Sequence, residues 1–364
     1  MPRTTFAMVQ TAPRRLEARE LALPECDADS GLLRVEACGI CGSDVEQFAG
    51  DLRVALPAIP GHEPVGVVEA IGERAAARWG VAVGDRVAVE TIVSCRFCPA
   101  CLAGRYHLCR ARRIYSYVPL AEPPGLWGAY AEHLYLAPGA LVHRIDPSLP
   151  PEIAVLFNPL GAGFRWAVEL PELRPGETVL VLGPGQRGLA SVIACREAGA
   201  GAILVTGLAR DARKLELARL FGADHAIDAE REDVRARVRE LTDGRGADVV
   251  VDTTPYATGA VREAIDCAAV GGRVVLAGVK GFRPVERFVS DKIVLKELRV
   301  QGAIGVTWSG YENAIRLLES RRLPLEKMHT HEFPLREAET AIRTLAGELA
   351  GEASIHSCLL PGRA

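Results

Sequence analysis

From residue 177 onward the chain alternates between short apolar runs and helical stretches. The first run, TVLVLG, leads through a glycine-rich turn into the helical stretch GLASVIACREAG. The later apolar runs are AILVTG, ADVVVDTT and GRVVLAG, and the helical stretches between them include ARKLELARLFGA, EDVRARVRELT and AVREAIDCAAV. Such alternation predicts an α/β domain with a doubly wound parallel sheet and right-handed crossovers.

The glycine-rich turn has the spacing of a dinucleotide-binding loop. Gly183, Gly185 and Gly188 follow a strand and open a helix. The first glycine permits the tight turn, the second lets backbone approach a pyrophosphate, and the third lets the helix pack on the strand. The helix N-terminus offers free N–H groups to the phosphates, and we expect Gln186 and Arg187 to share in this contact. An ordinary strand-to-helix turn is the alternative.

The end of the next strand bears on the choice of cofactor. An NAD site usually has a carboxylate there for the ribose, whereas AILVTG ends at Gly207 and is followed by Arg210 and Arg213. Loss of the carboxylate removes repulsion toward a 2′-phosphate, and arginine can pair with that group. This pattern favours NADP over NAD. The alternative is a solvated helix start, with Asp211 turned toward the ribose.

The chain has 364 residues, which favours two domains. Residues 1–150 contain β-like runs separated by Gly and Pro, namely LLRVEACGI, VGVVEAIG, GDRVAVE and AEHLYLAP. They predict a compact, mostly antiparallel β unit. Residues 151–171 read as helical, and 290–364 as mixed, with one clear amphipathic helix in YENAIRLLESRR.

Four cysteines lie within 15 residues in a C-x2-C-x2-C-x7-C pattern: Cys95, Cys98, Cys101 and Cys109. Four thiolates close a tetrahedral zinc shell and leave no position for substrate, so the expected site is structural. Metal binding replaces a core that so short a loop cannot build. An iron–sulfur cluster is the chemical alternative. His107, inside the last gap, is interpreted as a bystander.

A second group of metal-binding residue types lies upstream. Cys38-Gly-Ile-Cys41-Gly-Ser43-Asp44 is followed by Gly61-His62-Glu63-Pro64. Cysteine, histidine and a carboxylate from separate loops are the ingredients of an open zinc site.

Taken in order, CGICGSD, GHEPVGVVEAIG, the four-cysteine lobe, VLGPGQRG and DKIVLKELRVQG resemble the medium-chain zinc-dependent alcohol dehydrogenase superfamily, especially its sorbitol- and threonine-dehydrogenase-like members. The resemblance covers essentially the whole chain. It implies a GroES-like β-rich catalytic domain from residues 1–155 and 296–364, with the zinc lobe at about 93–112. A Rossmann domain is implied for 156–295.

The resemblance also assigns roles. Cys41 and His62 match the first two ligands of a catalytic zinc, and Glu63 matches an adjacent carboxylate that binds zinc in some members. Asp44 matches the residue that orients the ligand histidine. Ser43 matches the hydroxyl that takes the proton of the substrate alcohol, while zinc lowers the proton affinity of that oxygen.

Two positions depart from the family pattern. Glu46 stands where a relay histidine is common; it could carry the proton itself, the relay could run through water, or Glu46 could be a solvated charge. Asn158 stands where the family usually has a third protein ligand, and a neutral amide is a poor zinc ligand. We therefore expect Glu63 or water to complete the zinc shell, with Asn158 at hydrogen-bonding distance.

These features predict an enzyme that transfers hydride between a primary or secondary alcohol, or a polyol, and NAD(P), with two zinc ions per chain. The alternatives are a carbonyl reductase that mainly consumes NADPH, and a cofactor-binding relative with little turnover. A net charge of −3 and a pI near 6.3 give no reason to expect nucleic-acid or membrane partners. Without an apolar signal segment in MPRTTFAMVQTAP, the expected location is cytoplasmic. The resemblance suggests a homodimer or homotetramer.

Overall fold

The computed structural model describes residues 3–349, 351 and 354–363. The chain divides into two compact units, which we call the terminal unit (Met1–Asn158 with Ile315–Ala364) and the inserted unit (Pro159–Ala314). Helix α5 (Phe157–Gly163) leads into the inserted unit, and α11 (Trp308–Ser320) leads out of it. Among the described residues, no helix combines the length and apolar character needed to cross a membrane.

The terminal unit is built on a seven-stranded sheet, as the β-like runs predict. Its order is β16-β17-β3-β4-β5-β9, with β8 also paired to β3. All of its pairings are antiparallel except β16 with β17. The strands are β3 (Gly31–Gly39), β4 (Pro64–Ile71), β5 (Arg86–Val89), β8 (His133–Leu136), β9 (Val142–Arg144), β16 (His329–Pro334) and β17 (His356–Leu360).

Smaller elements complete this unit. A hairpin of β1 (Thr4–Ala12) and β2 (Arg15–Ala22) packs its apolar face into the same core, which also receives Tyr115, Tyr130 and Leu359. The remaining strands of the terminal unit are β6 (Ile92–Val93) and β7 (Arg113–Ile114). The helices are α1 (Gly42–Ala49), α2 (Glu73–Trp79), α3 (Pro99–Leu102), α4 (Pro151–Ala154) and α12 (Ala338–Leu345), with short 3-10 turns η1 (Tyr106–Leu108), η4 (Leu325–Lys327) and η5 (Leu335–Glu337).

The inserted unit contains a six-stranded parallel sheet in the order β12-β11-β10-β13-β14-β15. This is the doubly wound arrangement that the alternating pattern predicts. The strands are β10 (Thr178–Leu182), β11 (Ala202–Gly207), β12 (His225–Asp228), β13 (Ala247–Asp252), β14 (Ala268–Leu276) and β15 (Arg299–Gly302). Because β15 completes this sheet, the predicted domain boundary at residue 295 falls inside the inserted unit, which runs to residue 314.

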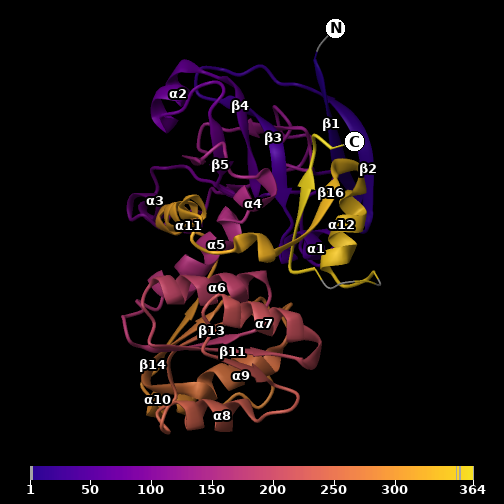
Figure 1. Ribbon diagram of the computed structural model, residues 1–364. Helices are drawn as coiled ribbons and strands as arrows, with labels where there is room; N and C mark the ends of the chain where they lie inside the picture. Colours follow the sequence, from indigo (N-terminus) through magenta and orange to yellow (C-terminus); the bar gives the residue numbers. More distant parts are fainter. Residues whose placement is uncertain (1–2, 350, 352–353, 364) are drawn as a thin grey trace. The chain divides into compact units, whose positions relative to one another are not determined.

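Helices cover both faces of the parallel sheet. In Figure 1, α6 and α7 lie on one face and α8 and α9 on the other, so the apolar strands between them are buried. The helices are α6 (Gln186–Glu197), α7 (Ala212–Leu220), α8 (Val234–Leu241), α9 (Thr258–Cys267) and α10 (Asp291–Leu295), with the π-helix η2 (Phe164–Glu169) and the 3-10 turn η3 (Ala209–Asp211).

Candidate active site and metal centres

Cys41, His62 and Glu63 meet at one point of the terminal unit. The metal-binding atoms of these three side chains all lie within 4.8 Å of one another. Strands β3 and β4 bring them together, because the antiparallel pair Cys38 with Pro64 places the end of β3 beside the start of β4. Cys41 follows β3 as the N-cap of α1, and His62 and Glu63 directly precede β4.

Glycine is required just before His62. Gly61 has a φ of 91°, and a β-carbon there would lie 2.3 Å from the ring of Tyr130. The glycine therefore fixes the turn that presents His62 to the site.

Asp44 orients two members of this cluster. Its Oδ1 lies 3.3 Å from Nδ1 of His62, and its Oδ2 accepts the backbone N–H of Cys41 at 2.8 Å. Burial lowers the pKa of His62, but Asp44 and Cys41 outweigh that effect and raise the pKa well above its ordinary value.

The donor set fits zinc. A thiolate, an imidazole nitrogen and a carboxylate oxygen are its usual protein ligands, and three of them leave one position open. With Asp44 at Nδ1, the ring nitrogen left for a metal is Nε2, which lies 3.9 Å from Oε1 of Glu63. His62 is buried and Glu63 is fully buried.

Ser43 borders the same cluster. Its hydroxyl lies 3.3 Å from Nε2 of His62, which places it beside the metal position. Tyr117 is close by, with its ring centroid 6.3 Å from that of His62, and its phenol contacts the Ser43 hydroxyl. Glu46 lies three residues after Ser43 on α1 and is half-buried.

Asn158 is buried and is connected to His62 through Thr91. Its amide nitrogen donates to Oγ1 of Thr91 at 3.2 Å, and the Thr91 hydroxyl donates to the backbone carbonyl of His62 at 3.0 Å. Asn158 thus braces the segment that carries His62.

The four cysteines of the lobe converge as well. The Sγ–Sγ distances are 3.5 Å for Cys98–Cys101, 3.5 Å for Cys109–Cys95 and 3.9 Å for Cys95–Cys101. Sulfur ligands of a tetrahedral zinc with bonds of ~2.3 Å lie about 3.8 Å apart, so the cluster fits a single zinc ion. An iron–sulfur cluster sets its thiolates further apart. His107 is buried beside the ring of Tyr106 and is not among the grouped ligands.

The lobe is tied to the sheet through a buried carboxylate. The Tyr106 phenol donates to Oε2 of Glu90 at 2.7 Å, and Nε2 of His143 lies 3.0 Å from Oε1. Burial raises the pKa of Glu90, although the contacts with His143 and Tyr106 act to lower it. Because Glu90 directly precedes Thr91, the same backbone segment touches both the lobe and the His62 carbonyl.

In the inserted unit, the glycine-rich turn is tight and is open on one side. Gly183 has a φ of 92°, and a β-carbon on Gly188 would lie 1.9 Å from the carbonyl oxygen of Gly183. A β-carbon on Gly185, the N-cap of α6, would meet nothing within 4 Å, so that face of the turn is open. Thr253 secures the turn by donating to the carbonyls of Leu182 and Gly183 at 2.9 and 3.0 Å.

Strand β11 ends at Gly207, which has no carboxylate. A side chain on Gly207 would meet Pro184 at 2.9 Å and Leu215 at 3.1 Å. The carboxylate of Asp211 accepts the N–H of Leu208 at 3.1 Å and pairs with Lys214 at 3.0 Å, so it is engaged within its own turn. Arg210 and Arg213 are exposed beside it, and Arg187 lies over the ring of Trp166 at 5.6 Å.

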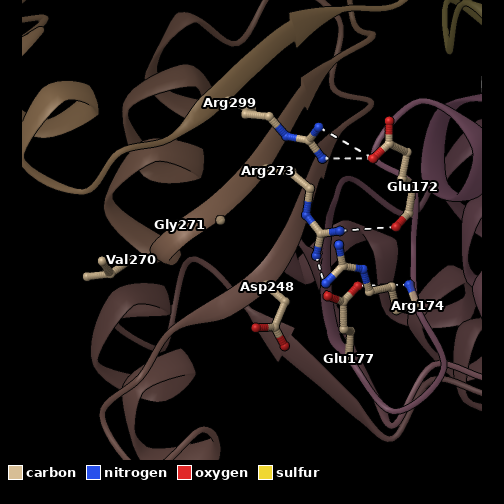
Figure 2. Close-up of a pocket in the computed structure, with 9 residues that line it drawn as sticks. Glu172, Arg174, Glu177, Asp248, Val270, Gly271, Arg273 and Arg299 are labelled. Carbon is tan, nitrogen blue, oxygen red and sulfur yellow. Dashed lines mark hydrogen bonds and ion pairs between the residues drawn. The ribbon is translucent and has the colours of Figure 1, made fainter.

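A hollow of about 290 Å³ lies at the amino ends of the strands of the parallel sheet, and Figure 2 shows the charged side chains that line it. Its charges compensate one another: Arg273 pairs with Glu177 at 2.6 Å, and Arg299 pairs with Glu172 at 3.4 Å. Ligands of doubly wound sheets bind at the carboxyl ends of the strands, whereas Glu177 and Arg299 lie at the amino ends of β10 and β15. This hollow is therefore not the nucleotide site.

Several residues that brace these sites were not predicted. Besides Thr91 and Thr253, Ser116 lies with its hydroxyl 3.5 Å from Nδ1 of His62. None belongs to a motif, and each acts through a contact that only the fold creates.

Comparisons with known proteins agree with this geometry. Residues 27–147 match the model described as alcohol dehydrogenase GroES-like domain, and residues 188–320 match zinc-binding dehydrogenase. A Mycobacterium tuberculosis protein named "probable alcohol dehydrogenase adh" is 48% identical over 98% of both chains. A Sinorhizobium meliloti structure described as a "putative zinc-binding dehydrogenase" bound to NADP has a TM-score of 0.87 at 27% identity, covering 99% of this chain and 100% of its own. An Escherichia coli structure described as a "short chain alcohol dehydrogenase" complexed with NADH has a TM-score of 0.84 at 25% identity, covering 98% of this chain and 99% of its own.

Proposed function

The chain belongs to the zinc-dependent medium-chain alcohol dehydrogenases, and from this premise we propose how its own residues divide the work. The enzyme transfers hydride between an alcohol or polyol, or the matching carbonyl compound, and a nicotinamide cofactor. The observation that carries the proposal is the convergence of Cys41, His62 and Glu63 within 4.8 Å.

Cys41, His62 and Glu63 would hold the catalytic zinc, and the four lobe cysteines would hold the structural zinc. Bound zinc supplies a Lewis acid that lowers the proton affinity of an alcohol oxygen. Asn158 would support the segment of His62 through Thr91, because its amide nitrogen donates to the Thr91 hydroxyl, which donates to the His62 carbonyl. Glu63→Ala should then lose the catalytic zinc, while Asn158→Ala should mostly keep it. Metal content per chain measures both, and the reverse pattern would refute this ligand set.

Ser43 would take up the proton of the alcohol at Oγ. Its position, 3.3 Å from Nε2 of His62, supports this role. Glu46 follows one helical turn later on α1 and would pass the proton outward, either directly or through water. Ser43→Ala should lower kcat far more than it weakens cofactor binding. A loss confined to cofactor binding would argue against this proton route.

The nicotinamide cofactor provides the hydride acceptor or donor. Its pyrophosphate would lie against Gly183, Gly185, Gln186, Arg187 and Gly188. For the adenosine end we propose NADP, because Gly207 offers no carboxylate and Asp211 is engaged by Lys214. Arg210 and Arg213 would then face the 2′-phosphate. Comparing kcat/KM for NADP and NAD tests this choice, and a strong preference for NAD would overturn it.

The broadest test of function is a panel of alcohols, polyols and aldehydes run with both cofactors on protein of known zinc content. Two zinc ions per chain and turnover of any panel member support the proposal. Cofactor binding without turnover of any member would instead favour a non-catalytic relative. Much faster reduction of aldehydes with NADPH than oxidation of alcohols would indicate a carbonyl reductase. The cytoplasmic location stays a prediction.

We further infer self-association through the exposed edge of the inserted unit's sheet. Strand β15 ends the strand order, and its residues are exposed. Val294, Leu295 and Ile304 next to it are exposed apolar side chains. Two copies could join β15 to β15 and continue the sheet. If this edge forms the homodimer or tetramer interface, Val300→Lys should lower the molecular mass of the particle that analytical ultracentrifugation measures.

A further inference from the structure

A buried ion pair joins the carboxyl ends of β13 and β14. Asp252 is the last residue of β13 and is fully buried, and the mostly buried Lys280 lies in the turn that follows β14. Nζ of Lys280 lies 2.8 Å from Oδ2 of Asp252. Because a buried ion pair adds little net stability compared with apolar side chains of similar size, stability alone does not account for this pair.

Thr254 lies at the centre of the contacts that this pair makes. Its backbone N–H and its hydroxyl donate to Oδ1 of Asp252 at 3.0 and 2.6 Å. The Lys280 ammonium donates to the Thr254 hydroxyl at 3.1 Å and also to the Thr254 carbonyl. Together with Oδ2 of Asp252, these acceptors match the three N–H groups of the ammonium. Lys280 therefore holds Thr254 rather than offering its charge to a ligand.

Thr254 in turn touches two glycines that have no room for a side chain. A β-carbon on Gly183 would lie 2.7 Å from Cγ2 of Thr254, and one on Gly278 would lie 2.1 Å from the Thr254 carbonyl oxygen. Gly183 opens the glycine-rich turn after β10, whereas Gly278 follows β14. The position of Thr254 thus sets the spacing between the turns at three strand ends.

These strand ends belong to one half of the proposed cofactor site. The strand order reverses between β10 and β13, since β11 and β12 lie on one side of β10 and β13, β14 and β15 on the other. Dinucleotides bind across such a point, with one half over each side. The adenosine end is proposed to lie past β11, at Arg210 and Arg213. The nicotinamide half then lies over the ends of β13 and β14, where Thr254 and Gly278 are.

We propose that Lys280 is a positioning residue for the nicotinamide half of the cofactor, and that it acts by holding Thr254 in place together with Asp252. A fixed Thr254 keeps the ends of β13 and β14 in the shape that the bound cofactor requires, so less ordering has to accompany binding. This inference rests on the proposed function, in which the inserted unit binds the nicotinamide cofactor.

The test compares two probes on the zinc-loaded enzyme: NADPH, and 2′,5′-ADP, which carries the adenosine half alone. Lys280→Met should weaken NADPH binding about tenfold, because Thr254 loses its anchor, and should leave the affinity for 2′,5′-ADP unchanged. It should also lower kcat, since a misplaced nicotinamide reacts more slowly. A loss shared equally by both probes would show a general loosening of the inserted unit and would overturn the inference. If the parent prefers NAD, NADH and 5′-AMP serve as the two probes.

A double variant separates positioning from stability. Lys280→Met alone leaves the buried Asp252 without its ion pair, which destabilises the protein. Combining it with Asp252→Asn removes that charge and should recover the denaturant midpoint of unfolding. It should not recover the NADPH affinity, because the Thr254 carbonyl still lacks its ammonium donor. Recovery of NADPH affinity together with stability would overturn the inference, and so would parent-like NADPH affinity in Lys280→Met.

Lys296→Met is the matched control. The Lys296 ammonium also makes three hydrogen bonds, to the carbonyls of Ile265, Asp266 and Ala268 at 2.9, 2.9 and 2.8 Å, but these lie at the amino end of β14. This variant should lose stability without changing the ratio of the affinities for the two probes. A parent enzyme that binds neither NADPH nor NADH would instead contradict the proposed function.

Discussion

The carboxylate of Asp44 lies 3.3 Å from Nδ1 of His62, and it also accepts the backbone N–H of Cys41. One buried side chain thus sets the position of two proposed zinc ligands. Asp44→Ala should lower the affinity of the catalytic site for zinc by about 10- to 100-fold, because both ligands lose their orientation. Chelator competition measures this loss. Retained affinity would show that the backbone alone positions the ligands.

Gly39 should not tolerate even one methyl group. A β-carbon there would lie 2.7 Å from Oε2 of Glu63, so Gly39→Ala must displace the carboxylate. We expect loss of the catalytic metal and of turnover, while the lobe keeps its zinc. Metal analysis after gel filtration measures the two sites together. A fully active Gly39→Ala enzyme with two zinc ions would exclude a close fit around Glu63.

The arginine after β11 should determine cofactor preference. Arg210→Ala should reduce kcat/KM with NADP about tenfold or more, because a charge-assisted contact to the 2′-phosphate is lost. The value with NAD should change little. Arg219→Ala, an exposed arginine near the other end of α7, is the matched control. Equal losses with both cofactors would place Arg210 outside the 2′-phosphate site.

The contact between Tyr106 and Glu90 should stabilise the terminal unit. Tyr106→Phe removes a 2.7 Å hydrogen bond and leaves the buried Glu90 with one contact fewer. The free energy of unfolding should fall by about 1–3 kcal/mol. Denaturant titration of the zinc-loaded protein measures it. An unchanged midpoint would mean that water replaces the phenol.

Glu263 on α9 provides a prediction for pH. Burial raises its pKa above 4.5, and the neighbouring Asp233, Asp252 and Asp266 raise it further. The stability that Glu263 contributes is therefore present below about pH 4.5 and is lost as the pH rises through its folded-state pKa. Glu263→Gln should melt at a higher temperature than the parent at neutral pH, with a smaller difference at pH 5. Calorimetry at several pH values measures this trend, and a difference that does not vary with pH would contradict it.

Local signals in the sequence predict much of the fold, and they predict the residues at the centre of each candidate site. The runs TVLVLG, AILVTG and ADVVVDTT predict β10, β11 and β13, because buried parallel strands are continuously apolar. The four-cysteine spacing likewise predicts the cluster of thiols, since short loops bring these residues together whatever the rest of the chain does.

Elements that depend on distant partners were not predicted. Strand β15 lies past the expected boundary at residue 295, and its residues are exposed at a sheet edge, so no apolar run marks it. The hairpin β1–β2, the strands β16 and β17, and the helix α12 were also missed. The same reason applies to the pairing of β17 with β3, which joins segments far apart in the chain.

The terminal unit consists of residues 1–158 and 315–364, and this has a consequence for synthesis on the ribosome. Because domains tend to fold as units while the chain emerges, the inserted unit can fold before the terminal unit is complete. Strand β17 follows the inserted unit in the sequence and pairs with β3, beside the segment that leads to Cys41. The metal cluster therefore receives this neighbouring strand only after the whole inserted unit has been made, so nascent protein should acquire its catalytic metal late.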